Sequence, residues 1–184
     1  MFTIREATAA FAKIDHLPED RIPQLDKTLR NLTQRTYFPP IERDGRTDHF
    51  GLETICALRI VHKAAVFGLD RAKLETAAQF LQQPQAGQGR RVKVPGGWKV
   101  LRPIEEAIER VKAGETFSIT IVMERDGSIR VRPTWTTEVP LAAATSNAEA
   151  EEILADSGLA QPVDASFVIP ASRFIADLLA ELDF

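Results

Sequence analysis

Long hydrogen-bond donors are concentrated in residues 24–37, on a stretch whose apolar residues recur at helical spacing. A guanidinium suits the two acceptors on the edge of guanine, and a side-chain amide suits the donor and acceptor on the edge of adenine. A helix can contact base edges and phosphates when one face presents such donors and the opposite face holds it on its domain. The stretch therefore has the residue types of a helix that reads duplex DNA. The donors are Lys27, Arg30, Asn31, Gln34 and Arg35.

A polar, arginine-containing turn follows this donor helix. Pro39 and Pro40 cannot continue a helix, so the chain must change direction after residue 37. The Asp44-Gly45 pair between two short extended arms predicts a hairpin with a two-residue turn. Such a hairpin would reach the DNA backbone beside a groove. The side chains that it would offer are Arg43, Arg46 and Thr47.

Two other interpretations of this region stay open. Runs of charged residues usually face solvent, so the donors could belong to an ordinary solvated helix followed by an ordinary turn. Acidic residues in the same region also favour a protein-interaction module, such as a phage or plasmid accessory or an antitoxin-like adaptor, whose winged helix does not read bases. These acids are Glu19, Asp20, Asp26, Glu42, Asp44 and Asp48.

Four helices are expected in the first half of the chain, with the hairpin between the second and the third. Apolar spacing predicts them over residues 4–14, 24–37, 52–67 and 70–81. Thr3 followed by Glu6 is typical of the start of a helix, and Asp70 of another. Gly68 is expected to end the third helix as a left-handed cap.

This order of elements, together with its residues, resembles the winged helix-turn-helix DNA-binding domain of the MerR family of transcription regulators. The matching motifs are Thr28-Leu29-Arg30 in the recognition helix, Tyr37-Phe38-Pro39-Pro40 at its stop, Arg43-Asp44-Gly45-Arg46 to His49-Phe50 in the wing, Leu58-Arg59 and Phe67-Gly68-Leu69. The resemblance covers residues 24–81. It implies a sequence-specific transcriptional regulator that binds double-stranded DNA as a homodimer. It also adds Thr28 and His49 to the expected DNA-binding residues.

The chain departs from the MerR pattern in three ways. The segment between the first helix and Thr28 is longer than the tight turn of the family, and no long coiled-coil helix follows the fourth helix. The metal-sensing cysteines of some members are absent. The resemblance therefore implies DNA binding and a dimer, but it does not identify a metal or drug sensor.

Composition indicates a folded chain without a membrane segment. The 184 residues are 44% hydrophobic and 27% charged, which suits one domain or two small ones. There is no run of about eighteen apolar residues and no apolar signal-peptide core. The single cysteine, Cys56, fits a reducing compartment, so we expect a cytoplasmic protein.

The net charge of −3 is unevenly distributed along the chain. Residues 1–70 carry ten basic and ten acidic groups, whereas residues 71–112 carry nine basic and four acidic groups. Residues 138–184 carry one basic group and nine acidic ones. The acidic excess thus belongs to the tail, so the first half stays free to approach a polyanion.

Residues 84–89 are rich in Gln and Gly, as linkers are. They divide the chain into a winged helix-turn-helix domain (1–83) and a small α+β domain (90–184), so the predicted fold class is α+β. In the second domain we expect hairpins at 90–100 and 116–135, helices at 103–112, 142–158 and 172–182, and a strand at 165–170.

Two surfaces of the second domain have candidate roles. The basic run 90–102 would contact phosphates beyond the winged helix, or it is a surface hairpin whose Trp98 packs on the core. Dimerisation, and contact with a protein partner, are expected within 90–184. The apolar residues proposed for the dimer interface are Phe117, Ile119, Ile121, Phe174, Leu178 and Leu182.

No residue pattern predicts a catalytic, metal or cofactor site. His16, His49 and His62 lack the spacing of metal ligands, and there is no second cysteine. Cys56 lies in an apolar helical pattern without a neighbouring base, so it is expected in the core rather than as a nucleophile. We therefore expect a protein that is not an enzyme.

Overall fold

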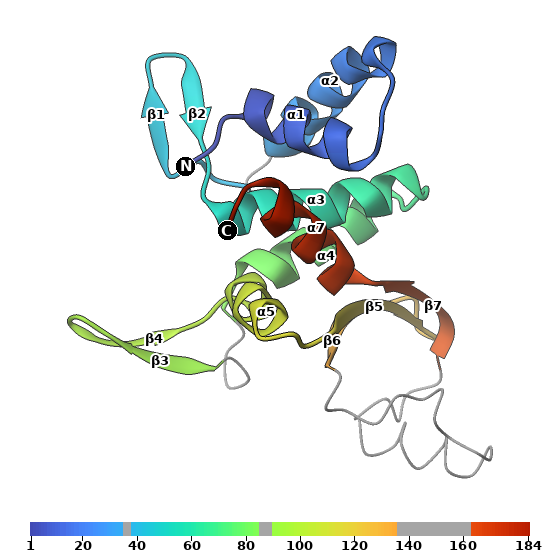
Figure 1. Ribbon diagram of the computed structural model, residues 1–184. Coiled ribbons are helices and arrows are strands. Elements are labelled where there is room, and N and C mark those ends of the chain that lie inside the picture. Colours follow the sequence, from blue (N-terminus) through green and yellow to red (C-terminus); the bar gives the residue numbers. More distant parts are fainter. Residues whose placement is uncertain (35–37, 85–89, 136–162) are drawn as a thin grey trace.

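The computed structural model describes residues 1–34, 38–84, 90–135 and 163–184 and shows an α+β protein (Figure 1). No helix within these ranges is both long and apolar enough to cross a membrane. In chain order, the elements are α1 (Ile4–Ile14), the 3-10 helix η1 (Glu19–Arg21), α2 (Ile22–Thr33), β1 (Glu42–Asp44), β2 (Thr47–His49), α3 (Leu52–Val66), α4 (Arg71–Gln82), β3 (Arg91–Val94), β4 (Gly97–Val100), α5 (Pro103–Lys112), β5 (Phe117–Glu124), β6 (Ile129–Trp135), β7 (Val163–Ile169) and α7 (Ala171–Glu181).

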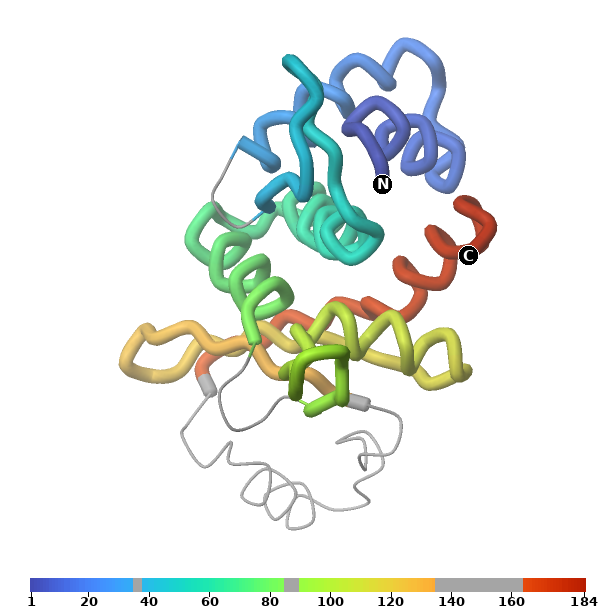
Figure 2. Tube along the Cα trace, turned by 90° about the vertical axis from the view of Figure 1, so that its left-hand side faces the viewer, coloured from blue at the N-terminus to red at the C-terminus, as the bar shows by residue number. Residues whose placement is uncertain are grey.

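The elements are arranged in two ends joined by central helices. α1, α2 and the β1–β2 hairpin lie at one end, and the sheet of β5, β6 and β7 lies toward the other (Figures 1 and 2). α3, α4 and α7 occupy the middle, while the β3–β4 hairpin projects from the side of the molecule (Figure 1). The donor helix and the hairpin that follows it are therefore at the same end.

Local sequence signals set most helix boundaries. Thr3 and Glu6 form the expected capping box at the start of α1, and Asp70 accepts a hydrogen bond from the Lys73 amide at the start of α4. Gly68 follows α3 with a positive φ of 99°. The predicted boundaries of α1, α3, α4, α5 and α7 are confirmed to within one residue. The helix expected at 142–158 lies outside the described residues.

The donor helix begins earlier than expected. α2 starts at Ile22, directly after η1, and Pro23 lies in its first turn, where a missing amide proton costs no helical hydrogen bond. It ends at Thr33, and the predicted extension to residue 37 falls on residues 35–37, outside the described part of the chain.

The β1–β2 hairpin turns one residue later than predicted. Its turn is Gly45-Arg46, with φ of 57° at Gly45, and Asp44 pairs with Thr47. A turn at Asp44-Gly45 would have placed Arg43 opposite Arg46. The observed register instead places Arg43 opposite Asp48, and opposite charges across a strand pair are stabilising where like charges are destabilising.

One hydrophobic core extends through both halves of the chain. Buried residues such as Phe11, Leu29, Leu58, Ile104 and Leu178 belong to a single cluster. α7 packs against α1 and α3, and α5 packs against α3 and α4. The packing thus crosses the predicted boundary at 84–89, and the division into two domains stays a prediction.

The apolar residues proposed for a dimer interface are already covered within the chain. The sheet has the antiparallel order β6-β5-β7, so β5 is its central strand. The apolar residues of β5 are buried except for Met123, and those of α7 are buried or packed against the same core. These residues therefore contribute to the core of a single chain, with Phe174 and Leu182 only partly buried, and their part in a dimer interface stays a prediction. They are Phe117, Ile119, Ile121, Phe174, Leu178 and Leu182.

A buried ion pair joins α1 to α3. Asp15, which caps the C-terminal end of α1, accepts hydrogen bonds from both terminal nitrogens of Arg59, at 2.6 and 2.7 Å, and from Lys63 Nζ at 2.7 Å. The Arg59 side chain is 1% exposed, and its guanidinium lies 4.9 Å from the centre of the Phe11 ring. Burial by itself raises the pKa of Asp15, but the hydrogen bonds from Arg59 and Lys63 outweigh burial and lower it to about 2.

This pair predicts a specific dependence of stability on pH. The pKa of Asp15 is depressed from 3.8, so its contribution of about 2 kcal/mol is present above pH 4 and is lost as the pH falls toward 2. Burial, followed by the charges of Arg59 and Lys63, lowers the pKa of His62 from 6.5 to about 4. Folding therefore keeps His62 neutral, and further unfolding free energy is lost as the pH falls from 6.5 to 4.

The Asp15→Asn variant should lose roughly 3–5 kcal/mol of unfolding free energy at pH 7, because Arg59 stays buried without its partner. Its stability should fall less between pH 4 and 2 than that of the wild-type chain, because only Glu105, whose pKa is also about 2, still contributes strongly there; the fall between pH 6.5 and 4 should remain. Urea unfolding at a series of pH values measures both. Asp164→Asn removes an exposed carboxylate 4.0 Å from Arg125 and serves as the control, with little change expected. Equal stability of the two variants at pH 7 would contradict this role of Asp15.

Candidate nucleic-acid interface

The two faces of α2 have opposite character. Leu25, Leu29 and Leu32 are buried and hold the helix on the core. The exposed residues are spaced at i, i+3, i+4 and i+7, so they share one face, opposite the leucines. The predicted donor face is therefore confirmed for four of its five residues, and Arg35 lies outside the described part. The four residues are Lys27, Arg30, Asn31 and Gln34.

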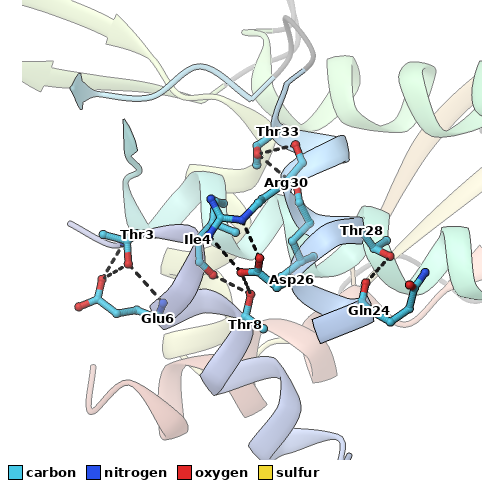
Figure 3. Close-up of polar contacts among 10 residues, drawn as sticks. Thr3, Ile4, Glu6, Thr8, Gln24, Asp26, Thr28, Arg30 and Thr33 are labelled. Carbon is cyan, nitrogen blue, oxygen red and sulfur yellow. Dashed lines mark hydrogen bonds and ion pairs between the residues drawn. The ribbon is translucent and has the colours of Figure 1, made fainter. Parts of the chain in front are cut away.

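Polar contacts fix α2 against α1. The Thr8 hydroxyl shares its one hydrogen between two acceptors, the Ile4 carbonyl at 2.8 Å and Asp26 Oδ1 at 3.3 Å, so one threonine joins the two helices (Figure 3). Thr8 is buried and Asp26 is partly buried, which protects this link from solvent. The orientation of the donor face thus depends on α1 as well as on the leucines.

Arg30 is held by a carboxylate of its own helix. Its Nε donates to Asp26 Oδ2 at 2.6 Å and its Nη2 donates to Oδ1 at 3.3 Å (Figure 3). The hydrogen bond that Arg30 donates to Asp26 keeps the pKa of Arg30 above its usual value. The Arg30 side chain is still 57% exposed, so it is accessible but not unpaired.

Thr28 is less available than the resemblance implied. It is partly buried, and its hydroxyl donates to the Gln24 carbonyl at 2.8 Å (Figure 3). Its donor hydrogen is thus used within the helix, and only its acceptor capacity remains.

The β1–β2 hairpin presents a second set of exposed polar side chains. Arg43 donates to Asp48 through Nε at 2.6 Å and Nη2 at 3.2 Å, and this pair keeps the pKa of Arg43 above its usual value and that of Asp48 below. Arg46 at the turn and Thr47 after it are exposed. Arg46 has no carboxylate within 4 Å among the described residues.

The N-terminus anchors the base of this hairpin. Phe2 and Phe50 exchange two backbone hydrogen bonds of 2.8 and 2.9 Å, and Phe50 is buried. His49, next to this bridge, is partly buried. Hydrogen bonds from Thr3, together with a smaller effect of the His49 charge, lower the pKa of Glu6. His49 pairs with Glu42 beside the Phe2–Phe50 bridge, so it lies at the base of the hairpin, near the start of α1, rather than at the tip.

The positive and negative charges of α2 and the β1–β2 hairpin nearly cancel, yet the carboxylates paired with the arginines are easily replaced by another anion. Ion pairs between exposed side chains contribute only about 0–1 kcal/mol. A phosphate can therefore replace Asp26 on Arg30, or Asp48 on Arg43, at small cost. Within the described parts of α2 and the β1–β2 hairpin, Lys27 and Arg46 have no carboxylate within 4 Å and could contact a polyanion without such an exchange.

The arginines were predicted from the sequence, but their pairing with these carboxylates was not. The i, i+4 spacing of Asp26 and Arg30 was a signal for the first pair. The Arg43–Asp48 pair could not be found from the expected turn, because the turn lies one residue later. A groove of about 750 Å³ between α1 and α2, lined by Arg5 and Arg30 among others, was also not foreseen.

Other chemistry has little support among the described residues. Burial raises the pKa of the Cys56 thiol to about 12, which confirms Cys56 as a core residue rather than a nucleophile. No group of three or more histidine, cysteine or acidic side chains that could hold a metal ion lies in the described ranges.

Comparison of the chain with known protein families, with curated proteins and with solved structures finds no match. The interpretation of this surface therefore rests on its own residues and their geometry.

The Asp48→Asn variant tests whether this surface binds a polyanion. Without Asp48, Arg43 no longer has to exchange a carboxylate for a phosphate, so affinity at low salt should rise by about 1 kcal/mol or less while the slope of log K against log salt stays nearly unchanged. Fluorescence anisotropy with labelled duplex DNA over a range of salt concentrations measures both the affinity and the slope. Asp164→Asn removes the same charge at the sheet and is the matched control. An equal gain in both variants would show an effect of net charge only.

Proposed function

We propose that this chain is a sequence-specific, double-stranded DNA-binding transcriptional regulator of MerR-like type, in which α1, α2, the β1–β2 hairpin, α3 and α4 form a winged helix-turn-helix. One observation carries the proposal. α2 is fixed on the core by its leucines and exposes four long donors on the opposite face, at the same end of the molecule as an arginine-bearing hairpin (Figure 1).

In this proposal α2 is the recognition helix. Lys27 and Gln34 lie opposite the buried leucines, so they would enter a major groove first, with Arg30 and Asn31 on either side. Arg30 suits guanine, and Asn31 and Gln34 suit adenine, by paired hydrogen bonds. Arg35, which follows on the chain, stays a proposed contact.

The β1–β2 hairpin is the proposed wing. Arg46 and Thr47 at its tip, and Arg43 after release from Asp48, would contact the sugar–phosphate backbone beside the groove. Such contacts position the protein and carry no sequence information, so α2 would supply the base specificity. His49 would support the hairpin rather than contact DNA, because it lies beside α1.

A second candidate function is a protein-interaction module. The observation in its favour is that Arg30 and Arg43, the central cations of α2 and the hairpin, are each neutralised by a carboxylate. A neutral, polar surface of this kind suits a protein partner better than a polyanion. Under this alternative, the winged helix would bind no duplex at low salt.

Dimerisation is part of the proposal. One recognition helix makes few phosphate contacts, so such domains usually bind paired half-sites as two-fold dimers. A protein truncated near Gln85 would lose α5 and α7, which pack on α1, α3 and α4. The oligomeric state should therefore be measured on the full chain.

Selection from a random duplex library by the full chain tests the function. We expect a defined sequence to be enriched. Gln34→Ala should cost about 1–3 kcal/mol on that sequence and relax the preference at one position. Arg46→Gln should weaken binding to all sequences alike and reduce the salt slope by about 0.9. Failure of the wild-type chain to retain any duplex at low salt would reject the function in favour of a protein-interaction module.

The selected sequence should contain two related half-sites, spaced by about one helical turn or a multiple of it. Light scattering should find two chains on each such duplex. A single half-site and a monomeric complex would show that the dimer is not part of the function.

A further inference from the structure

The β3–β4 hairpin has one face that is exposed and chemically distinctive. In its register Lys93 lies opposite Trp98, and Arg91 lies two residues before Lys93, which places it on the same face. All three are exposed, and the guanidinium of Arg91 lies 5.9 Å from the centre of the Trp98 ring. The hairpin therefore presents an indole flanked by two cations.

The remaining cations of the basic run 90–102 anchor the hairpin to the body. Arg90 pairs with Glu109, and Lys99 Nζ donates to Glu105 at 2.7 Å. Arg102 donates to Glu53 at 2.9 Å, to Gln82 at 3.0 Å and to Glu105 at 2.9 Å. Arg91 and Lys93 have no carboxylate within 4 Å among the described residues. The run thus divides into three cations that hold the hairpin and two that face outward.

The exposure of Trp98 is unusual for its type. Tryptophan is highly buried on average, yet Trp98 is 64% exposed, so the alternative in which it packs on the core was wrong. Its side chain adds apolar surface that contacts Arg91 but not the core. An amphipathic ring between two cations matches a nucleic-acid backbone, in which phosphates alternate with less polar sugars.

The position of the hairpin favours duplex DNA over other anionic partners. It projects on the same side of the molecule as the β1–β2 hairpin, and the sheet does not lie between them (Figures 1 and 2). A long, regular polyanion can meet two separate hairpins at once. A lipid surface is less suited, because a single exposed ring offers little apolar area for insertion.

We propose that the β3–β4 hairpin is a second DNA-contacting element, which binds the phosphate backbone of the duplex outside the segment read by α2. Arg91 and Lys93 each contact a phosphate, and Trp98 packs against the sugars between them. This inference rests on the proposed function, because it needs the same duplex to be held by α2 and the β1–β2 hairpin.

The test uses the full chain and two duplexes, one limited to the selected sequence and one extended by about ten base pairs on each side. The Arg91→Gln, Lys93→Gln double variant should bind the extended duplex about ten- to a hundredfold more weakly at low salt, with a salt slope smaller by about 1.8. Its binding to the short duplex should be unchanged. Arg125→Gln, Arg173→Gln removes two exposed cations elsewhere and is the matched control, with no length-dependent loss expected.

Trp98 provides an independent readout. The chain has two tryptophans, so Trp135→Phe leaves Trp98 as the only one. Its fluorescence should be quenched by the extended duplex and not by the short one.

Equal losses in the test and control variants, losses on both duplex lengths, or quenching by anionic phosphatidylserine vesicles instead of DNA would each overturn the inference. If the wild-type chain binds neither duplex, the proposed function fails as well. If it binds both and the hairpin variant is unaffected, only this inference fails.

Discussion

The ion pair between Asp15 and Arg59 is the constraint on which the end of the molecule carrying α2 depends. A buried guanidinium left without a partner costs roughly 3–5 kcal/mol, so α1 must end where its last carboxylate reaches both terminal nitrogens of Arg59. α1 then positions α2 through the link from Thr8 to Asp26 and through shared apolar packing. The direction in which the donors of α2 point is thus determined from the centre of α3.

Charge compensation is the second organising feature. The chain carries many cations, but most of those near α2 and the two hairpins are engaged by carboxylates that either hold the fold or cover an arginine. The cations left without a carboxylate near them, within the described ranges, include Lys27, Arg46, Arg91 and Lys93. They lie on α2 and on the tips or faces of the hairpins. This distribution reconciles a negative net charge with a surface suited to a polyanion.

The shared core links the two halves mechanically. α7 returns to pack on α1 and α3, and Lys13 of α1 pairs with Glu181 of α7 at 2.8 Å. The C-terminal segment therefore supports the helices that hold α2, in addition to completing the sheet. The apolar faces of β5 and α7, which the sequence had suggested for a dimer interface, pack in this shared core.

The sequence by itself determined the elements whose signals lie within one or two turns of chain. Thr3 with Glu6, Gly68 and Asp70 set helix ends because a cap needs only neighbouring residues, and the alternation of leucines with donors set the two faces of α2. Tertiary structure alone decided that Arg59 is buried, that Trp98 is exposed, and that the apolar faces of β5 and α7 meet within one chain. It also brought Arg43 opposite Asp48, against the local turn signal. Burial and exposure depend on which distant part of the chain covers a residue, and ion pairs depend on charges that meet only across strands or helices. The spacing of neighbouring residues contains neither kind of information.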